Sequence, residues 1–107
     1  MPSGIAFYKN SIWASFASAN VLIRFNLNTM RVELRIGGKS SPFSTPKNIF
    51  IDGNCAYVCN NSTNNITKVN LENYSVEEHC AFEEGVHSFV KSGKYEFVLL
   101  DSGLYLL

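Results

Sequence analysis

The sequence repeats itself at a spacing of 44 residues, and this internal repeat limits the folds open to the chain more than any other feature. When the chain is shifted by 44 places, residues 2–37 align with residues 46–81, and nine of the 36 aligned positions are identical. Average composition would give about two identities by chance. A third, partial copy begins near His87 at a spacing of 40 residues. Its alignment with the second copy places Gly93 on Gly53, Phe97 on Tyr57 and Val98 on Val58.

A repeat of 40 to 44 residues is typical of few architectures, and the local pattern of apolar residues decides between helices and strands. Segment 71–82 is the best candidate for a helix, because Ser75 and Glu78 could form a capping box there. Its aligned partner, segment 29–36, alternates strictly between apolar and polar side chains, which indicates a strand. Since aligned copies should share one conformation, we predict strands in both segments.

The remaining apolar runs also have the length and bounding turns of strands. Each full copy is predicted to hold four of them: 5–8, 11–16, 21–27 and 31–36, then 48–51, 55–59, 66–71 and 75–80. Four strands in a period of about 40 residues are typical of a β-propeller blade. We therefore predict an all-β fold of consecutive four-stranded antiparallel β-propeller blades. The single repeat region 1–107 divides into blade one (2–37), blade two (46–81) and a partial blade three (87–107).

Segment 46–60, PKNIFIDGNCAYVCN, resembles the YVTN type of propeller repeat. That family follows a proline with an apolar strand, an Asp-Gly turn, and then Tyr-Val and a small residue before Asn. Six positions match this pattern here: Pro46, Asp52, Gly53, Tyr57, Val58 and Asn60. Cys59 stands where threonine is usual, and Asn70 replaces an aspartate that usually ends the next strand. The resemblance implies a propeller fold and carries little information about activity.

The first copy also resembles streptogramin-lyase-like and NHL-type blades. Segments 2–7 (PSGIAF) and 11–16 (SIWASF) hold the Pro-x-Gly-Ile-Ala and Ile-Trp motifs of those families at the same places. Closed propellers have about four to eight blades, whereas two complete repeats and part of a third are present here. The sequence therefore predicts an incomplete propeller, either a fragment of a longer one or a unit that copies of the chain complete, with a monomeric minidomain as the third possibility.

Charge and composition exclude several classes of partner. Nine basic and nine acidic residues cancel, and neither sign is clustered, so neither nucleic acid nor a membrane is an expected partner. No apolar run approaches the length of a bilayer span, and no secretory signal opens the chain. The expected location is cytoplasmic by default, or secreted if the chain is a fragment of a longer precursor. Three cysteines, Cys55, Cys59 and Cys80, are an odd number and are predicted to be small buried residues rather than disulfides or zinc ligands.

One set of polar residues is a candidate binding site. The repeat alignment equates Ser3, Lys47 and His87, each of which comes just before the predicted innermost strand of its blade. In propellers that strand lines the central channel, so these three residues are predicted to ring the mouth of the channel and to bind a ligand. The competing interpretation is that all three are exposed polar loop residues. His79 is predicted to be a solvated residue at the edge of an outer strand.

The sequence offers no set of catalytic residues, cofactor motif or metal-ligand cluster. Trp13, Tyr57 and Phe97 occupy equivalent positions and are predicted to pack one blade on the next. The expected function is therefore a non-catalytic propeller module that serves as a scaffold for a protein or a small-molecule ligand. Its other expected partners are the remaining propeller blades or further copies of the chain. The alternative is a fragment of a propeller enzyme of the lyase or lactonase type, whose catalytic residues lie in missing blades.

Overall fold

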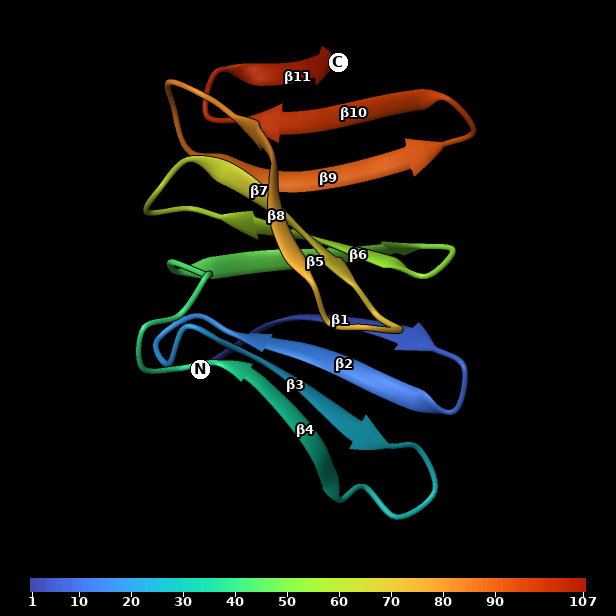
Figure 1. The fold of residues 1–107 in the computed structure, drawn as a ribbon. Helices are drawn as coiled ribbons and strands as arrows, with labels where there is room; N and C mark the ends of the chain where they lie inside the picture. The colour runs from blue at the N-terminus through green and yellow to red at the C-terminus, as the bar shows by residue number, and fades with distance from the viewer.

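The computed structural model describes residues 1–107 and consists of eleven strands in three antiparallel sheets, without a helix (Figure 1). The first sheet contains β1 (Pro2–Tyr8), β2 (Ser11–Phe16), β3 (Val21–Asn26) and β4 (Val32–Gly37). The second contains β5 (Pro46–Asp52), β6 (Cys55–Asn60), β7 (Asn65–Asn70) and β8 (Val76–Ala81). The third contains β9 (Val86–Ser92), β10 (Tyr95–Leu100) and β11 (Gly103–Leu106). The predicted all-β class is confirmed, and segment 71–82 holds β8 rather than a helix.

The first strand of each full sheet begins earlier than predicted. The expected ranges were 5–8 and 48–51, because they start at the first apolar side chains, whereas β1 begins at Pro2 and β5 at Pro46. The extra residues are held by the neighbouring strand, since Pro2 pairs with Phe16 and Pro46 pairs with Asn60. The length of the partner strand therefore sets these boundaries, and the side-chain pattern of the first strand does not reveal it.

The turns of the copies agree in backbone conformation as well as in position. Three sets of aligned residues have left-handed φ angles: Lys9 (54°), Gly53 (60°) and Gly93 (59°); Asn20 (53°) and Asn64 (56°); Met30 (59°) and Tyr74 (62°). Residues other than glycine seldom adopt this conformation. Its recurrence at the repeat spacing shows that the copies fold alike, as the alignment predicted.

The sheets pack face to face and bury two separate apolar cores. Between the first and second sheets lie Trp13, Leu22, Phe43, Ile49, Ala56, Val58, Val69 and Leu71. Between the second and third sheets lie Tyr57, Cys59, Ile66, Val86, Phe89 and Val98. Successive side chains of a strand point to opposite faces, so β6 serves both cores, with Ala56 and Val58 on one face and Tyr57 and Cys59 on the other. The prediction that Trp13 and Tyr57 pack one sheet on the next is confirmed.

The cysteines differ in burial, although all three are free thiols. Cys59 is buried as predicted, and burial raises the pKa of its thiol to about 12. Cys55 and Cys80 are only half-buried, so the prediction of burial holds fully for one cysteine of the three. Cys55 lies at the start of β6 and Cys80 on the outer strand β8, where neighbouring sheets cover less of each side chain.

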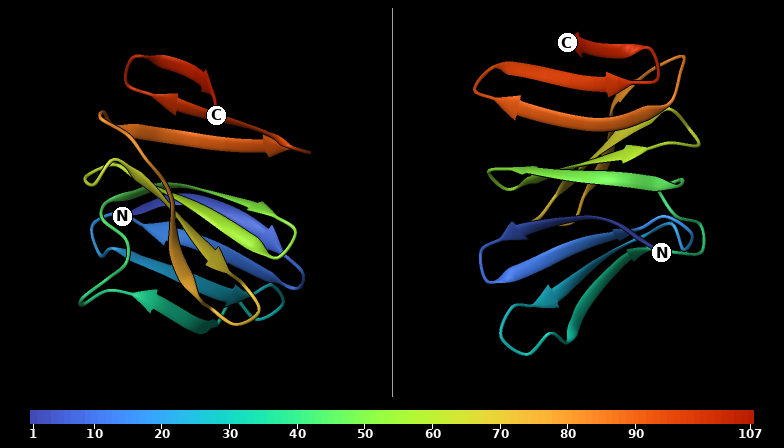
Figure 2. Two further views of the ribbon diagram at one scale, coloured as in Figure 1. Left: turned by 45° about the horizontal axis from the view of Figure 1, so that its top comes forward. Right: turned by 180° about the vertical axis from the view of Figure 1, so that it is seen from behind.

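The first strands of the three sheets lie side by side. β1 packs against β5, and β5 packs against β9, while the later strands of each sheet extend away from this row (Figure 2). Segments 38–45 and 82–85 connect the last strand of one sheet to the first strand of the next. The row β1–β5–β9 is therefore the one place where strands from all three sheets are neighbours.

Candidate functional site

Ser3, Lys47 and His87 occupy the same irregularity in three different strands. Each is the extra residue of a β-bulge near the start of its strand: the pairing passes from Pro2 to Gly4 in β1, from Pro46 to Asn48 in β5, and from Val86 to Ser88 in β9. A bulge leaves one residue outside the ladder and turns its side chain away from the regular alternation. The equivalence that the repeat alignment assigned to the three residues therefore has a structural counterpart.

The bulged ends of the strands are joined to one another by hydrogen bonds. Ser3 Oγ lies 2.5 Å from Pro46 O, which links β1 to β5. Asn48 Nδ2 donates to Ser88 Oγ at 2.8 Å, which links β5 to β9. No hydrogen bond joins the side chains of Ser3, Lys47 and His87 directly. The structure thus places the three residues at one end of the strand row without forming a single side-chain cluster.

Close backbone approach at this end depends on Gly4. A Cβ atom there would lie 2.9 Å from Ser15 Oγ and 3.1 Å from both Asn48 Cα and Ile49 N. Real Cβ atoms rarely come so near to backbone atoms, so another residue at this position would push β1 away from β5. The glycine is therefore needed for contact between the first two sheets at the proposed site.

Ser3 is engaged by the protein itself. Its Oγ lies 2.9 Å from Ser15 Oγ in addition to its contact with Pro46 O. A hydroxyl has a single hydrogen, so the geometry fits donation to the Pro46 carbonyl and acceptance from the Ser15 hydroxyl. Ser15 is completely buried. Ser3 therefore holds β1 against β2 and β5 at this end of the strands, and its hydroxyl is not free to donate to a ligand.

His87 is exposed and paired with a carboxylate. Its Nε2 is hydrogen-bonded to Asp101 Oδ1, and Asp101 Oδ2 accepts the N–H of Gly85 at 3.0 Å. The hydrogen bond from His87, and then the one from Gly85, lower the pKa of the Asp101 carboxyl group below its ordinary value of 3.8. The adjacent turn is held by Glu84, whose carboxylate accepts the Ser102 N–H at 2.5 Å and the Ser102 hydroxyl at 2.8 Å.

Lys47 is exposed and forms no ion pair in the structure. The site therefore combines one unpaired ammonium group with an imidazole held by a carboxylate. This arrangement can bind an acidic or polar group by charge and hydrogen bonding. The hydrogen bond of His87 is to Asp101, and the neighbouring Ser88 hydroxyl accepts from Asn48.

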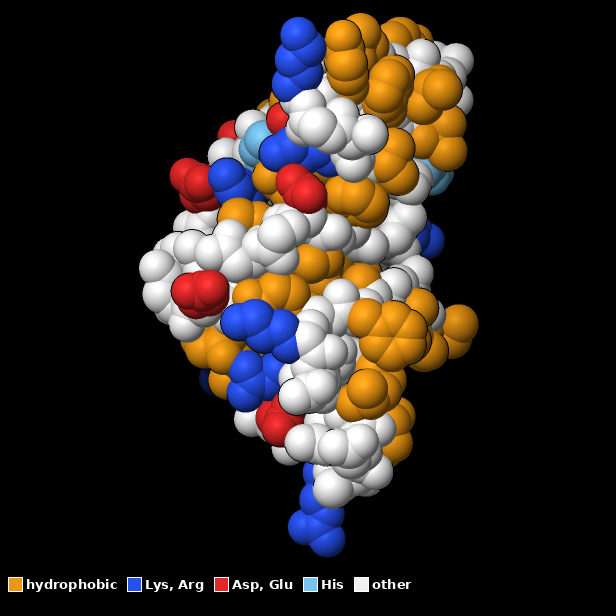
Figure 3. Space-filling view, turned by 90° about the vertical axis from the view of Figure 1, so that its right-hand side faces the viewer, with side chains coloured by type: hydrophobic (Ala, Val, Ile, Leu, Met, Phe, Trp, Pro, Cys, Tyr) orange, Lys and Arg blue, Asp and Glu red, His pale blue; other side chains and the backbone are white.

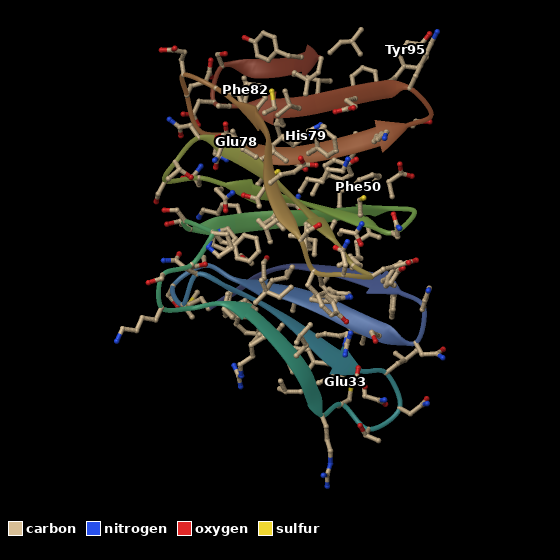
Figure 4. All side chains as sticks on the ribbon, viewed as in Figure 1. Glu33, Phe50, Glu78, His79, Phe82 and Tyr95 are labelled. Atoms are coloured by element: carbon tan, nitrogen blue, oxygen red, sulfur yellow. The ribbon has the colours of Figure 1, made fainter.

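His79 does not lie where the sequence predicted. Rather than being solvated, its side chain is only 22% exposed and its Nε2 lies 2.6 Å from Glu96 Oε1 on β10. Figure 4 labels His79 on β8. Its ring is also edge-on to Tyr57, with 5.0 Å between centroids. The sequence predicted one part of this contact, because Tyr57 was expected to pack one sheet on the next. The contact of β8 with the third sheet was not predictable from alternation along β8.

Other features of the surface do not add to the site. A depression of about 290 Å³ lies at the edge of the second sheet and is lined by Cys55, Lys68, Asn70, Ser75, Val76 and Glu77. No group of three or more histidine, cysteine or acidic side chains is arranged to hold a metal ion. The structure also contains no helix with the length and apolar character needed to cross a membrane.

Comparison with known proteins shows similarity in fold alone. No protein-family model matches the sequence, and no curated protein matches it. Among solved structures it is similar to the computationally designed Ika8 protein, with a TM-score of 0.72 and 12% identity over 98% of this chain and 32% of that one. It is also similar to the computationally designed Ika4 protein, with a TM-score of 0.59 and 9% identity over 100% of this chain and 90% of that one. The chain thus spans about a third of the length of Ika8, and identities this low bear on the fold and not on function.

Proposed function

We propose that this chain is a non-catalytic β-propeller module of the YVTN type, which serves as a scaffold for a protein or small-molecule ligand. On this proposal the three sheets are consecutive blades, 2–37, 46–81 and 87–107, of a larger propeller. The support is the repeated four-stranded meander, the matched turn conformations and the contact between first strands. Propeller blades have this strand order, with their first strands around a central channel.

The observation that carries the proposed binding site is the set of three aligned bulges. Bulges are frequent beside functional sites, where they aim a side chain out of the regular sheet. Here they put Lys47 and His87 at the same end of neighbouring strands, while Ser3 holds the frame. The exposed ammonium group and the imidazole favour a ligand with an acidic group, and the proposed role of each is to bind it by a charge-assisted hydrogen bond.

An NMR titration tests this site. Citrate serves as the acidic probe and glycerol as an uncharged one, and backbone amide shifts are followed in the labelled protein. Citrate should give saturable shifts centred on residues 47, 87 and 101, and glycerol should not. Lys47→Ala should weaken citrate binding at least tenfold, whereas Lys94→Ala, in the turn between β9 and β10, should leave it unchanged. Equal effects of the two substitutions, or shifts spread over the whole surface, would contradict the proposed site.

The alternative, a fragment of a lyase- or lactonase-type propeller enzyme, is favoured by one feature. Asp101 holds the imidazole of His87, as a carboxylate does for a histidine that acts as a general base. The groups that are missing would then come from further blades. The two proposals differ in turnover: hydrolysis of γ-butyrolactone by the folded chain, lost in His87→Ala, would support the enzyme and overturn the non-catalytic module.

A further inference from the structure

The stack of sheets ends on both sides in an uncovered apolar face. The first end face belongs to the first sheet and consists of two paired rows across β1, β2 and β3: Ile5, Ala14 and Ile23, and Phe7, Ile12 and Phe25. Ile5 and Phe7 are each 68% exposed, whereas Ala14 and Ile23 are only 9% and 6% exposed, so the most open part of this face lies on β1. The second end face belongs to the third sheet and consists of two rows across β9, β10 and β11: Ser88, Leu99 and Leu104, and Val90, Phe97 and Leu106. Neither set of rows contains a charged residue. Figure 3 shows hydrophobic side chains gathered at the level of the third sheet and again at the level of the first.

Exposure of these faces contrasts with the burial of their equivalents inside the molecule. Ile5 is 68% exposed, whereas Ile49, which is the same residue type at the aligned position, is 5% exposed. Leu99 is 44% exposed, whereas the aligned Cys59 is 1% exposed. A neighbouring sheet covers Ile49 and Cys59 and is absent from the end faces, and for the identical pair Ile5 and Ile49 this accounts for the difference in exposure.

The second end face also has a surface shaped to receive side chains. A shallow apolar depression of about 190 Å³ lies on it, lined by Ser88, Phe89, Val90, Phe97, Leu99 and Leu104. In the second sheet the aligned face receives Val86, Phe89 and Val98 of the third sheet. Monomeric proteins rarely leave large apolar patches uncovered, so a partner surface of the same kind is expected here.

Each end face is equivalent to a face of the second sheet that is covered by a neighbouring sheet within the chain. The first sheet packs on the face of the second that holds Ile49 and Val58, which align with Ile5 and Ala14 of the first end face. The third sheet packs on the face of the second that holds Tyr57 and Cys59, which align with Phe97 and Leu99 of the second end face. The second end face of one copy therefore matches the first end face of another copy.

We infer that copies of this chain associate head to tail, with the second end face of one copy docked on the first end face of the next. The contact continues the internal stacking, so it buries apolar rows against apolar rows, with Arg35 on β4 beside Ile23 at the edge of the first end face. A contact between two different faces closes into a ring if its rotation allows and otherwise extends as an open chain. This inference rests on the proposed propeller fold, whose further blades would then be supplied by copies of this chain, and it does not depend on the ligand site.

Two substitutions, each of which alters one end face, test the inference through the mass of the assembly, measured for each variant alone and for their mixture. Phe7→Lys blocks only the first end face and Leu104→Lys blocks only the second, because each residue lies on one face and is exposed. In analytical ultracentrifugation the unmodified chain should have at least twice its 12.0 kDa monomer mass. Each variant alone should be a monomer, and an equimolar mixture of the two should form a dimer through the pair of faces that remains intact.

Several outcomes would overturn the inference. A monomeric unmodified chain at all concentrations would assign the end faces to another occupant. Oligomers of Phe7→Lys would indicate contact between two copies of the second end face. A mixture that stays monomeric, while circular dichroism shows that both variants are folded, would exclude head-to-tail docking. Val76→Lys is the control, since Val76 is 37% exposed on β8 of the second sheet, outside both end faces, and should leave the mass of the assembly unchanged.

Discussion

His79 on β8 and Glu96 on β10 are joined by a hydrogen bond of 2.6 Å between Nε2 and Oε1, which ties the outer strand of the second sheet to the middle strand of the third. Both side chains are mostly buried, at 22% and 24% exposure. The same histidine ring is edge-on to Tyr57 and to Phe89, with centroid distances of 5.0 and 5.9 Å. A polar pair on the rim therefore reinforces the apolar contact between these two sheets.

A double-mutant cycle on this pair should reveal coupling. His79→Ala and Glu96→Ala are each expected to lower the free energy of unfolding by about 1–2 kcal/mol, and the coupling between them should be about 1 kcal/mol. Urea unfolding of the four proteins gives the values. The matched control is Lys68 and Glu77, whose charged atoms are 4.0 Å apart on a more exposed surface. That pair should show almost no coupling, and additive effects in the His79–Glu96 cycle would contradict the role of the bond.

Trp13 should be among the most costly side chains to remove. It is completely buried between the first two sheets, so Trp13→Ala is expected to lower the free energy of unfolding by about 3–5 kcal/mol. Trp13→Phe should cost clearly less, because it keeps a ring in the core and removes an indole N–H that has no hydrogen-bond partner. Thermal and urea unfolding measure both. A loss for Phe as large as the loss for Ala would contradict the packing role of the ring in this core.

Asn26 and Asn70 are 44 residues apart and cap the same turn in two copies. Asn26 Oδ1 accepts the N–H groups of Asn28 and Thr29 at 2.9 and 3.0 Å, and Asn70 Oδ1 accepts those of Glu72 and Asn73 at 2.8 and 3.2 Å. Asn70→Ala should therefore lower the free energy of unfolding by about 1 kcal/mol. Asn70→Asp keeps an acceptor oxygen and should retain most of the stability. If Asp proved as harmful as Ala in urea unfolding, these two hydrogen bonds would not be what holds the turn.

The pair of His87 and Asp101 should make stability depend on pH in the acid range. The pKa of the Asp101 carboxyl group is lower in the folded protein than its ordinary value of 3.8. Its contribution is therefore fully present above pH 3.8 and is lost as the pH falls through the lower, folded-state value. The difference in melting temperature between the unmodified chain and Asp101→Asn should shrink over that range.

His87→Ala provides the control for this titration, because it removes the largest cause of the shift and leaves the Gly85 N–H in place. NMR titration of the Asp101 carboxyl carbon should then give a pKa closer to 3.8. An unchanged value in His87→Ala would show that the hydrogen bond to the imidazole does not control this carboxyl group.

Much of the fold could be predicted from local pattern and repetition. Segment 71–82 has a capping-box sequence, yet alignment with the alternating segment 29–36 correctly assigned a strand, which is β8. The aligned copies have the same order of four strands, as the repeat predicted. The candidate site was predictable only in part. Alignment grouped Ser3, Lys47 and His87, but the bulges that displace them depend on the register between strands, and this register is a property of the pair of strands rather than of either one.

The sequence by itself determined the strand pattern, the equivalence of the copies and the apolar character of each face, because these follow from side-chain alternation and turn chemistry within a few residues. Only the tertiary structure decided which apolar faces are covered. Ile5 and Ile49 have the same side chain at equivalent positions, and one is exposed while the other is buried. Burial depends on the sheet that lies opposite, and so does the pairing of His79 with Glu96 across two sheets. Neither can be read from the residues that flank these positions.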